Sequence, residues 1–332
     1  MTAYLVRRLL AVIPLLIAVS FIVFVLIRSV PGDPVDAIYG EKATPEIRKQ
    51  VSERWGLDKP VLVQYWIYMK GVFVLDFGES YVHSGESIRG QILRHLPATI
   101  ELTLAALIIA ALAGILFGVL AAVYKSSWVD YFGMGIALIG VSVPVFWLGL
   151  IFLIILGGVF AGGQAISPHL AIPTVTGFLL VDTLLDLNLG AFLDVLRHMV
   201  LPAIALATYP TAMIARITRN TMLEVLDSDY IRTARAKGVN EERVVMGHAL
   251  KNSLIPIVTL GGLEFGYLLS GAVLTETVFS WPGMGRYILT SIDARDYLAV
   301  SGAIMVLAII FVLVNLMVDM LYVLIDPRIH YG

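Results

Sequence analysis

Long uninterrupted blocks of apolar residues constrain the fold of this chain more than any other feature. A helix needs about 20 mostly apolar residues to cross the hydrocarbon core of a bilayer. Six windows meet that need: 9–29, 98–123, 132–160, 199–217, 254–276 and 298–325. Only 14% of the 332 residues are charged, against about 25% in soluble domains. The sequence therefore predicts an all-α polytopic membrane protein with six transmembrane helices.

The first of these windows has to be distinguished from a cleaved signal peptide. Arg7 and Arg8 precede an apolar run from Leu9 to Ile27, which is longer than the core of a typical signal. The run ends at Arg28-Ser-Val-Pro-Gly-Asp33 without a pair of small residues that would mark cleavage. We therefore expect it to be retained as the first span.

The distribution of Lys and Arg over the short loops predicts the orientation in the membrane, because cytoplasmic loops are enriched in them. With the N-terminus inside, the outer loops hold only Arg197, Arg286 and Arg295. The inner segments hold many more: Arg7, Arg8, Lys125, Arg216, Arg219, Arg232, Arg235, Lys237, Arg243, Lys251 and Arg328. Both termini are therefore expected in the cytoplasm.

The segment 30–96 is patterned too regularly for a linker. We expect a turn at Pro31-Gly-Asp33-Pro34 and a helix from Pro45 to Trp55, capped by Thr44 and ended by Gly56. Aromatic residues that suit the outer membrane face follow at Tyr65, Trp66, Tyr68 and Phe73. The sequence predicts a small external subdomain.

The starts of two spans and the loop between residues 161 and 197 carry further local signals. Pro97 and Pro202 are expected in the first turns of their helices, where a missing N–H costs nothing. The stretch 178–196 is amphipathic and predicts a helix lying in the membrane interface. Asp182 and Asp186 on one face of it leave a cation site as the alternative.

The chain lacks the motifs of an enzyme. It has no phosphate-binding G-x-x-x-x-G-K-[ST] loop, no H-E-x-x-H motif and no cysteine. Its basic residues form no broad patch that would indicate nucleic-acid binding. We therefore expect no catalytic residue, no metal site and no cofactor in this chain, and a pump built on it must take its energy from a partner.

The longest inner segment, 218–252, is also the most basic. Residues 232–237 favour a short helix that Gly238 would end, and Asn240 can cap a second helix with Glu241 and Glu242 in its first turn. We expect the next span to begin at Pro256. The alternative is an ordinary inner loop without a partner, but the helix–Gly–helix pattern favours a docking element.

Several motifs together resemble the permease subunits of the dipeptide, oligopeptide and nickel ABC importers. Two of these motifs lie in the basic inner segment: Asp229-Tyr-Ile-Arg-Thr-Ala-Arg-Ala-Lys-Gly238 and His248-Ala-Leu-Lys-Asn-Ser-Leu-Ile-Pro256. The other matching motifs are Arg7-Arg8, Pro31-Gly-Asp33-Pro34, Leu96-Pro97-Ala-Thr99-Ile-Glu101-Leu, Phe279-Ser-Trp281-Pro282-Gly283-Met-Gly285-Arg286 and Asp326-Pro327-Arg328. They cover essentially the full length.

The resemblance implies a type I ABC importer permease fold of the MetI-like kind. It divides the chain into a cytoplasmic tip and first helix (1–29), an external subdomain (30–96), a permease core (97–326) with a coupling segment (218–256), and a cytoplasmic tail (327–332). The implied partners are a second homologous permease, two cytoplasmic ATP-binding subunits that hold ATP and Mg²⁺, and an external solute-binding protein. The implied location is the cytoplasmic membrane of a bacterium or archaeon.

The resemblance also assigns the contact with the ATPase to nine residues of the coupling segment: Asp229, Tyr230, Arg232, Thr233, Ala234, Arg235, Ala236, Lys237 and Gly238. Related importers carry a Glu-Ala-Ala-x-x-x-Gly pattern, and this chain has Arg232 in the place of that Glu. We therefore expect the contact to depend on small residues, Gly238 and positive charge.

Ionisable residues within spans are costly and usually functional. Glu264, flanked by Gly261, Gly262 and Gly266, is the main candidate for lining the pathway; a hydrogen bond across the subunit interface is its alternative. Glu276 is the second candidate, or an interfacial residue. Glu101 is expected in the first turn of its own helix, with a structural role. Asn315 and Asp319 are expected to form a polar contact between helices.

The external loop from Trp281 to Arg286 predicts a tight turn with an exposed aromatic residue. Trp281 and Arg286 are candidates for contact with the solute-binding protein.

The leading functional hypothesis is half of the pathway of an ATP-driven importer of dipeptides or oligopeptides. Within the family, a nickel chelate or glutathione is the alternative cargo. An ion-coupled secondary transporter using Glu264 and Asp319 is an alternative of a different class, but we find no inverted repeat of the kind common in such carriers. A structural membrane scaffold is the third.

Overall fold

The fold is all-helical apart from one isolated β-bridge between Glu79 and Ser87 in the described part of the chain. A computed structural model describes residues 2–29, 35, 43–80, 82, 85–160, 164–170 and 172–325. The predicted turn at residues 31–34 and the tail motif 326–328 lie outside these ranges, as do the side chains of Arg7, Arg8 and Asp319. The all-α prediction is confirmed.

The chain divides into two compact units, and each is described by itself. The first contains residues 1–98 and 282–313, and the second contains residues 99–281 and 314–332. Two long helices, α5 (Ile88–Val123) and α13 (Tyr297–Ile325), contribute to both.

The first unit also contains α1 (Thr2–Ser29), α3 (Pro45–Trp55), α4 (Val61–Val74) and α12 (Met284–Asp293). The predicted boundaries of α3 are confirmed: Thr44 Oγ1 accepts from the N–H of Ile47, and Gly56 ends the helix at φ 67°. The core of this unit packs α4, the first turns of α5, α12 and α13 together, with Phe77, Ile88, Met284 and Ala303 buried among its members.

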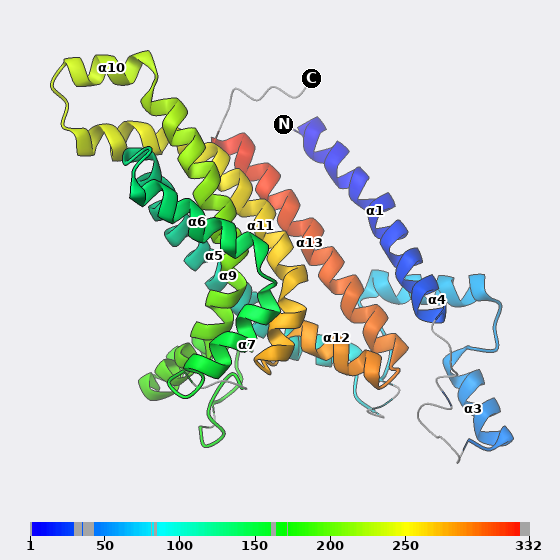
Figure 1. Cartoon of the computed structure of the whole chain (residues 1–332). Coiled ribbons are helices and arrows are strands. Elements are labelled where there is room, and N and C mark those ends of the chain that lie inside the picture. The colour runs from blue at the N-terminus through cyan, green and yellow to red at the C-terminus, as the bar shows by residue number, and fades with distance from the viewer. Residues whose placement is uncertain are drawn as a thin grey trace. The chain divides into compact units, whose positions relative to one another are not determined.

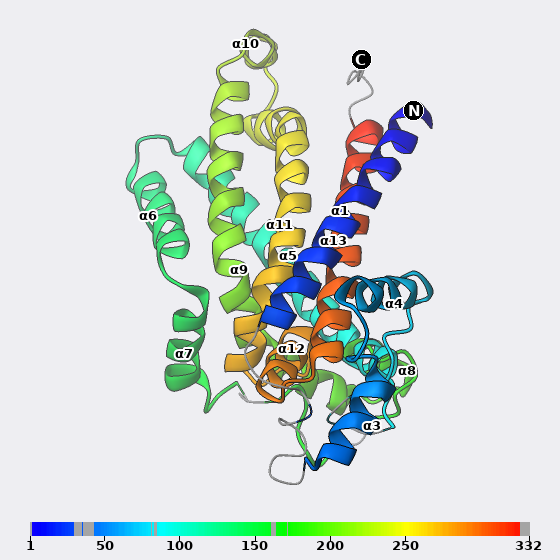
Figure 2. The same cartoon turned by 90° about the vertical axis from the view of Figure 1, so that its right-hand side faces the viewer.

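The second unit contains six further helical segments. They are α6 (Trp128–Ser142), α7 (Val145–Leu156), α8 (Leu179–Leu185), α9 (Leu189–Leu226), α10 (Asp229–Ala236) and α11 (Lys251–Val278), the last continuing from a π-helical stretch, η2 (Arg243–Leu250). Helix α9 lies beside α11 (Figures 1 and 2), and α10 lies where the chain passes from one to the other.

Glycines let the long helices of this unit approach closely. A Cβ on Gly118 of α5 would lie 2.5 Å from Thr218 Cβ on α9, and one on Gly262 of α11 would lie 2.4 Å from a methyl group of Val318 on α13. Small residues at such contacts are typical of helix packing in membranes. Gly262 therefore allows α11 and α13 to pack closely, whereas a Cβ on Gly261 would meet open space.

Among the described residues, four helical segments are long and apolar enough to cross a membrane: Ile88–Val123, Leu189–Leu226, Arg243–Leu269 and Tyr297–Val318. A fifth crossing requires that α6 and α7 together form one span. The predicted first span falls on α1, whose described apolar stretch, Leu10–Leu26, is shorter than that limit. The multi-pass architecture is confirmed, and the exact count of six remains a prediction.

The window 132–160 does not form the single straight helix that its composition suggested. Helices α6 and α7 meet at a bend of 106°. Pro144 disfavours helical geometry in the residue before it, and Val143 is extended at φ −94° and ψ 127°. This local effect ends α6 at Ser142.

The predicted positions of two prolines are wrong. Pro97 and Pro202 lie inside α5 and α9, well after the first residues of these helices. Helix α5 extends backwards because Ile88 and Ile92, spaced for one helical face, are buried in the core of the first unit. Pro256 likewise lies inside α11, so the prediction that a span begins there is also wrong.

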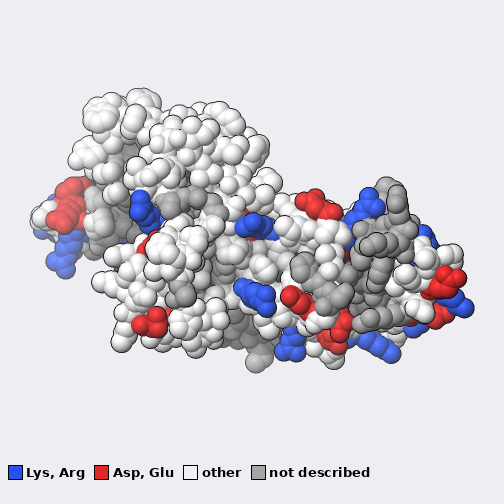
Figure 3. Space-filling model, turned by 90° about the horizontal axis from the view of Figure 1, so that it is seen from below, with Lys and Arg blue, Asp and Glu red and all other residues white. Residues whose placement is uncertain are grey.

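Charged side chains are mixed in sign on the face shown in Figure 3. Basic and acidic groups alternate there, and large areas carry neither.

Candidate functional site

Residues 229–238, within the predicted coupling segment, form the expected helix and glycine corner. Helix α10 ends with two hydrogen bonds, from Gly238 N–H to the Arg235 carbonyl (3.0 Å) and from Val239 N–H to the Ala234 carbonyl (3.2 Å). This is the pattern in which the residue after the cap is left-handed, and Gly238 has φ 77°. The backbone at this position therefore favours glycine.

The second part of the helix–Gly–helix prediction is also confirmed. Asn240 Oδ1 accepts from the N–H of Glu242 at 3.2 Å, and the chain then continues into η2 and α11. Arg235 bridges the corner with two bonds to the Glu241 carboxylate, of 2.6 and 3.0 Å. These bonds lower the pKa of Glu241 and raise that of Arg235.

The surface of α10 is largely open to solvent. Ile231 is fully buried and anchors the helix, whereas the side chains of Arg232, Thr233 and Ala236 are exposed and Ala234 is half-buried. Tyr230 connects α10 to α11, because its hydroxyl accepts a hydrogen bond from Asn252 Nδ2 at 2.8 Å. Helix α10 thus presents small and cationic side chains to solvent, while Ile231 and Tyr230 hold it in place.

Two predicted donors of this segment have partners within the chain. Arg235 pairs with Glu241, and Arg232 lies 3.3 Å from Asp229. Since the Arg232 pair is almost fully exposed, its guanidinium can exchange that contact for another at little cost.

The sequence does not predict an ion pair between Asp130, buried on α6, and Arg219, which it marks only as an inner positive charge. Arg219 donates two bonds to Asp130, of 2.6 and 2.7 Å, joining α9 to α6. Asp130 also accepts from the N–H of Ser126 at 3.0 Å. The signal lay in Asp130 itself, an aspartate in the first turn of an apolar helix.

A small apolar cluster lies where α5, α9 and η2 meet. Ala122, Met222, Val245 and Ala249 are buried together, from α5, α9 and η2. The helices on either side of α10 are therefore packed against one another, and α10 is not a free loop.

Glu264 lies in α11 with only 6% of its surface exposed. Its Oε2 atom is buried and has no hydrogen-bond partner among the described residues. A buried carboxylate without a partner is costly. A partner from outside this chain, whether cargo or a second subunit, would satisfy it.

Glu276, the second pathway candidate, is enclosed by the protein near the end of α11. Glu276 is fully buried, and Thr99 Oγ1 donates to its carboxylate at 2.6 Å. The group joins α11 to α5 within the second unit and faces no open lumen in this structure.

Glu101 does have a structural role, but not through a first turn of its own helix. It lies inside α5, where its two carboxylate oxygens accept from the N–H groups of Leu179 and Leu180 at 3.0 and 2.8 Å. These are free donors at the start of α8. The partner of Glu101 is thus a helix about eighty residues further along the chain.

The stretch 178–196 is not one helix, because Asp186, Leu187 and Asn188 separate α8 from α9. Asp182 is buried and accepts four bonds from residues 175–177. Among the described residues no three His, Cys, Asp or Glu side chains are grouped to hold a metal ion. Asp182 therefore organises a turn instead of supporting the cation site considered above.

The external-loop candidates differ in exposure. Trp281 is fully buried, so the prediction of an exposed aromatic residue is wrong. The backbone N–H of Trp281 donates to the Glu276 carbonyl at 2.8 Å. Arg286 is exposed in the first turns of α12. Asn315 is half-buried on α13, and its proposed pairing with Asp319 lies outside the described side chains.

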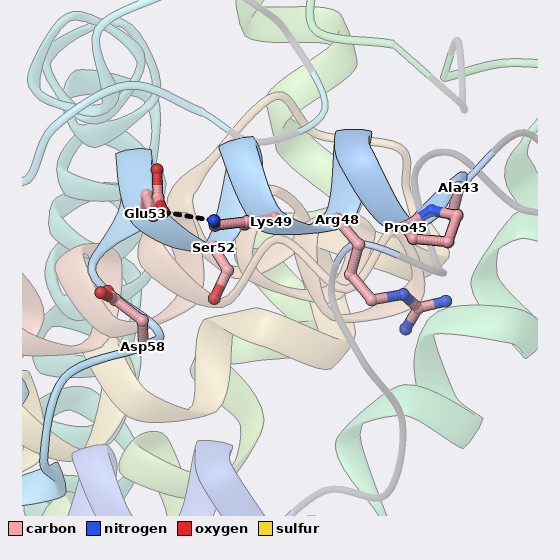
Figure 4. A pocket seen from close by; sticks show the side chains of 7 residues that line it. All are labelled: Ala43, Pro45, Arg48, Lys49, Ser52, Glu53 and Asp58. Atoms are coloured by element: carbon pink, nitrogen blue, oxygen red, sulfur yellow. Dashed lines mark ion pairs between the residues drawn. The ribbon is translucent and has the colours of Figure 1, made fainter.

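A surface hollow follows α3 and the turn after it (Figure 4). It is lined only by that helix and its flanks, with Arg48, Ser52 and Asp58 among the lining residues and an ion pair of 4.0 Å between Lys49 and Glu53. A depression bounded by a single helix has no opposing wall to enclose a solute.

Comparisons with known proteins place these features in a family. Residues 114–331 match the model of the binding-protein-dependent transport system inner membrane component, and residues 1–103 match the model of the N-terminal part of such components. The dipeptide transport system permease protein DppB of Alkalihalophilus pseudofirmus is 48% identical, with all of both chains covered. The di/tripeptide transport system permease protein DppB of Pseudomonas aeruginosa is 46% identical, covering 100% of this chain and 99% of that protein.

A solved structure shares the fold. A chain of the inward-facing MetNI methionine ABC transporter superposes with a TM-score of 0.56, covering 71% of this chain and 97% of the other. At 15% identity, this likeness concerns the fold alone, and it confirms the MetI-like prediction.

Proposed function

This chain belongs to the family of binding-protein-dependent transport system inner membrane components, and on that premise we propose that it forms half of the translocation pathway of an ATP-driven importer of dipeptides or oligopeptides. The observation that carries the cargo class is full-length similarity to permeases named for dipeptides and tripeptides. The observation that carries the coupling is the exposed helix α10 with its left-handed Gly238.

The proposed complex contains a second homologous permease, two ATP-binding subunits and an external solute-binding protein. ATP and Mg²⁺ belong to the ATP-binding subunits, and this chain carries out no hydrolysis itself. The proposed site is the cytoplasmic membrane of a bacterium or archaeon, with both termini inside. The excess of Lys and Arg in the segments assigned to the cytoplasm supports this orientation.

In this complex, residues 229–238 are the contact with an ATP-binding subunit. The proposal is supported by the small and cationic side chains that α10 exposes and by the packing of α9 against η2, which flank it. A helix held in this way would transmit a displacement of the ATP-binding subunit to α9 and α11, the spans that flank it.

Glu264 is the residue we assign to the pathway. Its buried Oε2 atom, which no described residue hydrogen-bonds, fits the amino group of a peptide, and a contact with the second permease is the alternative. Glu264→Gln keeps the shape and removes the charge, so we expect slower uptake or altered cargo preference. Uptake with unchanged rate and preference would remove Glu264 from the pathway.

Arg286 remains our candidate for contact with the solute-binding protein. The proposal is supported by its exposure on α12. If Arg286→Ala left the stimulation of ATP hydrolysis by the binding protein unchanged, this assignment would be wrong.

Purification of the native complex tests the function as a whole. We expect two ATP-binding subunits and a second permease to co-purify with the tagged chain, and mass spectrometry of the associated binding protein to reveal a peptide. A nickel chelate or glutathione in its place would change the cargo but not the class. Transport driven by an ion gradient without ATPase subunits would contradict the importer proposal.

A further inference from the structure

Helix α4, in the first unit, exposes apolar residues where a water-facing helix would carry polar ones. Leu62, Trp66 and Phe73 are 78%, 60% and 75% exposed. Val61, Val63, Ile67, Val74 and Leu75 are exposed as well. Only Met69 and Val72 are buried among the residues of this helix. An apolar surface of this kind marks an interaction site.

Helix α4 carries few polar groups, and Lys70 is its one exposed charged residue. The side chain of Gln64 bonds to Arg28 and to the carbonyls of Leu57 and Lys59. Between Val61 and Val74 the sequence holds one Lys and no Asp or Glu. The exposed face therefore offers almost no hydrogen-bonding groups to water.

The contacts of α4 with α1 place it at membrane depth. Tyr65 lies against the apolar run of α1, with its hydroxyl 2.9 Å from Ser20 Oγ and its ring 5.2 Å from that of Phe24. Ser20 precedes Arg28 by about 12 Å along the helix axis, at 1.5 Å per residue. A helix touching α1 at this level lies within the hydrocarbon or its boundary.

The length of α4 is too small for a crossing. Its 14 residues extend about 21 Å, against the roughly 30 Å of the hydrocarbon core. In Figures 1 and 2, α4 runs across α1 and not alongside it. Helix α1 also exposes apolar side chains, with Phe21 and Leu26 51% and 61% exposed.

We propose that α4 is an interfacial helix whose surface of Leu62, Trp66 and Phe73 lies among the lipid chains of the leaflet at the C-terminal end of α1. Trp66 and Lys70 are suited to this position, because indole rings and snorkelling lysines favour the headgroup level. The Lys70 ammonium lies 6.0 Å from the Trp66 ring, where it can reach lipid phosphates.

The absence of cysteine from the chain allows a direct test. Single variants Leu62→Cys and Phe73→Cys carry a nitroxide label in the assembled complex, reconstituted into nanodiscs of phosphatidylcholine and phosphatidylglycerol. Ile22→Cys on the exposed face of α1 is the lipid reference. Lys49→Cys on α3, with a side chain 79% exposed, is the water reference.

We expect labels at 62 and 73 to collide with oxygen as at position 22, and with a water-soluble nickel chelate at least fivefold less often than at position 49. Nickel collisions equal to those at position 49 would show a water-facing surface and overturn the proposal. Protection from both reagents would show a protein occupant, such as the second permease or the binding protein, and would also overturn it.

A second readout avoids changes to the apolar face. Brominated lipids should quench the fluorescence of Trp66, which is the tryptophan fluorescence present in the wild type and absent from Trp66→Phe. Equal quenching of the wild type and this variant would place Trp66 outside the lipid.

Discussion

At the scale of single residues, buried carboxylates determine how neighbouring segments are held. Glu101, Asp130, Asp182 and Glu276 each accept hydrogen bonds from a different part of the second unit. Paired in this way, a carboxylate is stable in a buried place and fixes its partner's position. Glu264 differs from these four carboxylates, because one of its oxygens has no hydrogen-bond partner in the described part of the chain.

The pair of Asp130 and Arg219 makes the clearest prediction at this scale. Asp130→Asn leaves a partly buried guanidinium without its counter-charge, and we expect a loss of about 3 kcal/mol, near the lower end for breaking a buried pair. The double variant Asp130→Asn with Arg219→Gln should recover part of it. The measurement is a double-mutant cycle on thermal unfolding of the complex. Strictly additive effects would show that the pair is not coupled.

Asp182 predicts a pH dependence. Burial by itself raises the pKa of Asp182, but hydrogen bonds from Thr176, Gly177 and Val175 outweigh it and hold the pKa below the usual range. Because the folded value is depressed, the stabilisation is complete above the ordinary aspartate pKa and is lost as the pH falls through the folded value.

Thermal unfolding of the wild type and of Asp182→Asn as a function of pH measures this effect. The wild type should unfold at the higher temperature by a constant margin above about pH 5, and the margin should shrink below about pH 4. A margin that stayed constant down to about pH 3 would contradict the account.

At the scale of elements, α10 and its corner are held by local interactions. The Gly238 conformation follows from the end of α10, whereas the position of the helix depends on the burial of Ile231 and on the packing of α9 against η2, which flank α10. A substitution can therefore act on the conformation of the corner or on the surface that α10 presents, and the two effects are separable.

We expect Gly238→Asp and Ala234→Asp to stop transport while the chain remains in the membrane, because each places a negative charge on the proposed contact. Gly238→Asn is the matched control, since Asn tolerates a left-handed backbone and carries no charge. It should retain much of the activity, and so should Ala234→Ser. The measurement is ATP-driven uptake in vesicles containing equal amounts of complex.

Normal uptake by both aspartate variants would show that residues 229–238 do not couple. If Gly238→Asn were as inactive as Gly238→Asp, conformation and not charge would be the cause.

Elements determined by neighbouring residues could be predicted from the sequence, and those determined by distant packing could not. The caps of α3 and the corner at Gly238 follow from short motifs. The backward extension of α5 does not, because burial of Ile88 and Ile92 outweighs the usual placement of Pro97. Trp281 was misjudged for the same reason: its loop motif indicates a turn but says nothing of what buries the ring. The position of Glu264 was predictable, whereas its unpaired oxygen was not.

At the scale of the whole molecule, the chain is a multi-pass membrane protein of a transport family. The family and the fold support the spans and the general function. The proposed contact at residues 229–238 would connect these spans with the ATP hydrolysis of a partner subunit.

Site-specific cross-linking tests this central claim most directly. In the cysteine-free chain, Thr233→Cys on the exposed face of α10 receives a short thiol-directed photo-cross-linker in the assembled, transport-active complex, with Glu53→Cys on α3 as the control. The account predicts an adduct between position 233 and an ATP-binding subunit and none from position 53. An active complex in which position 233 forms no such adduct would contradict it.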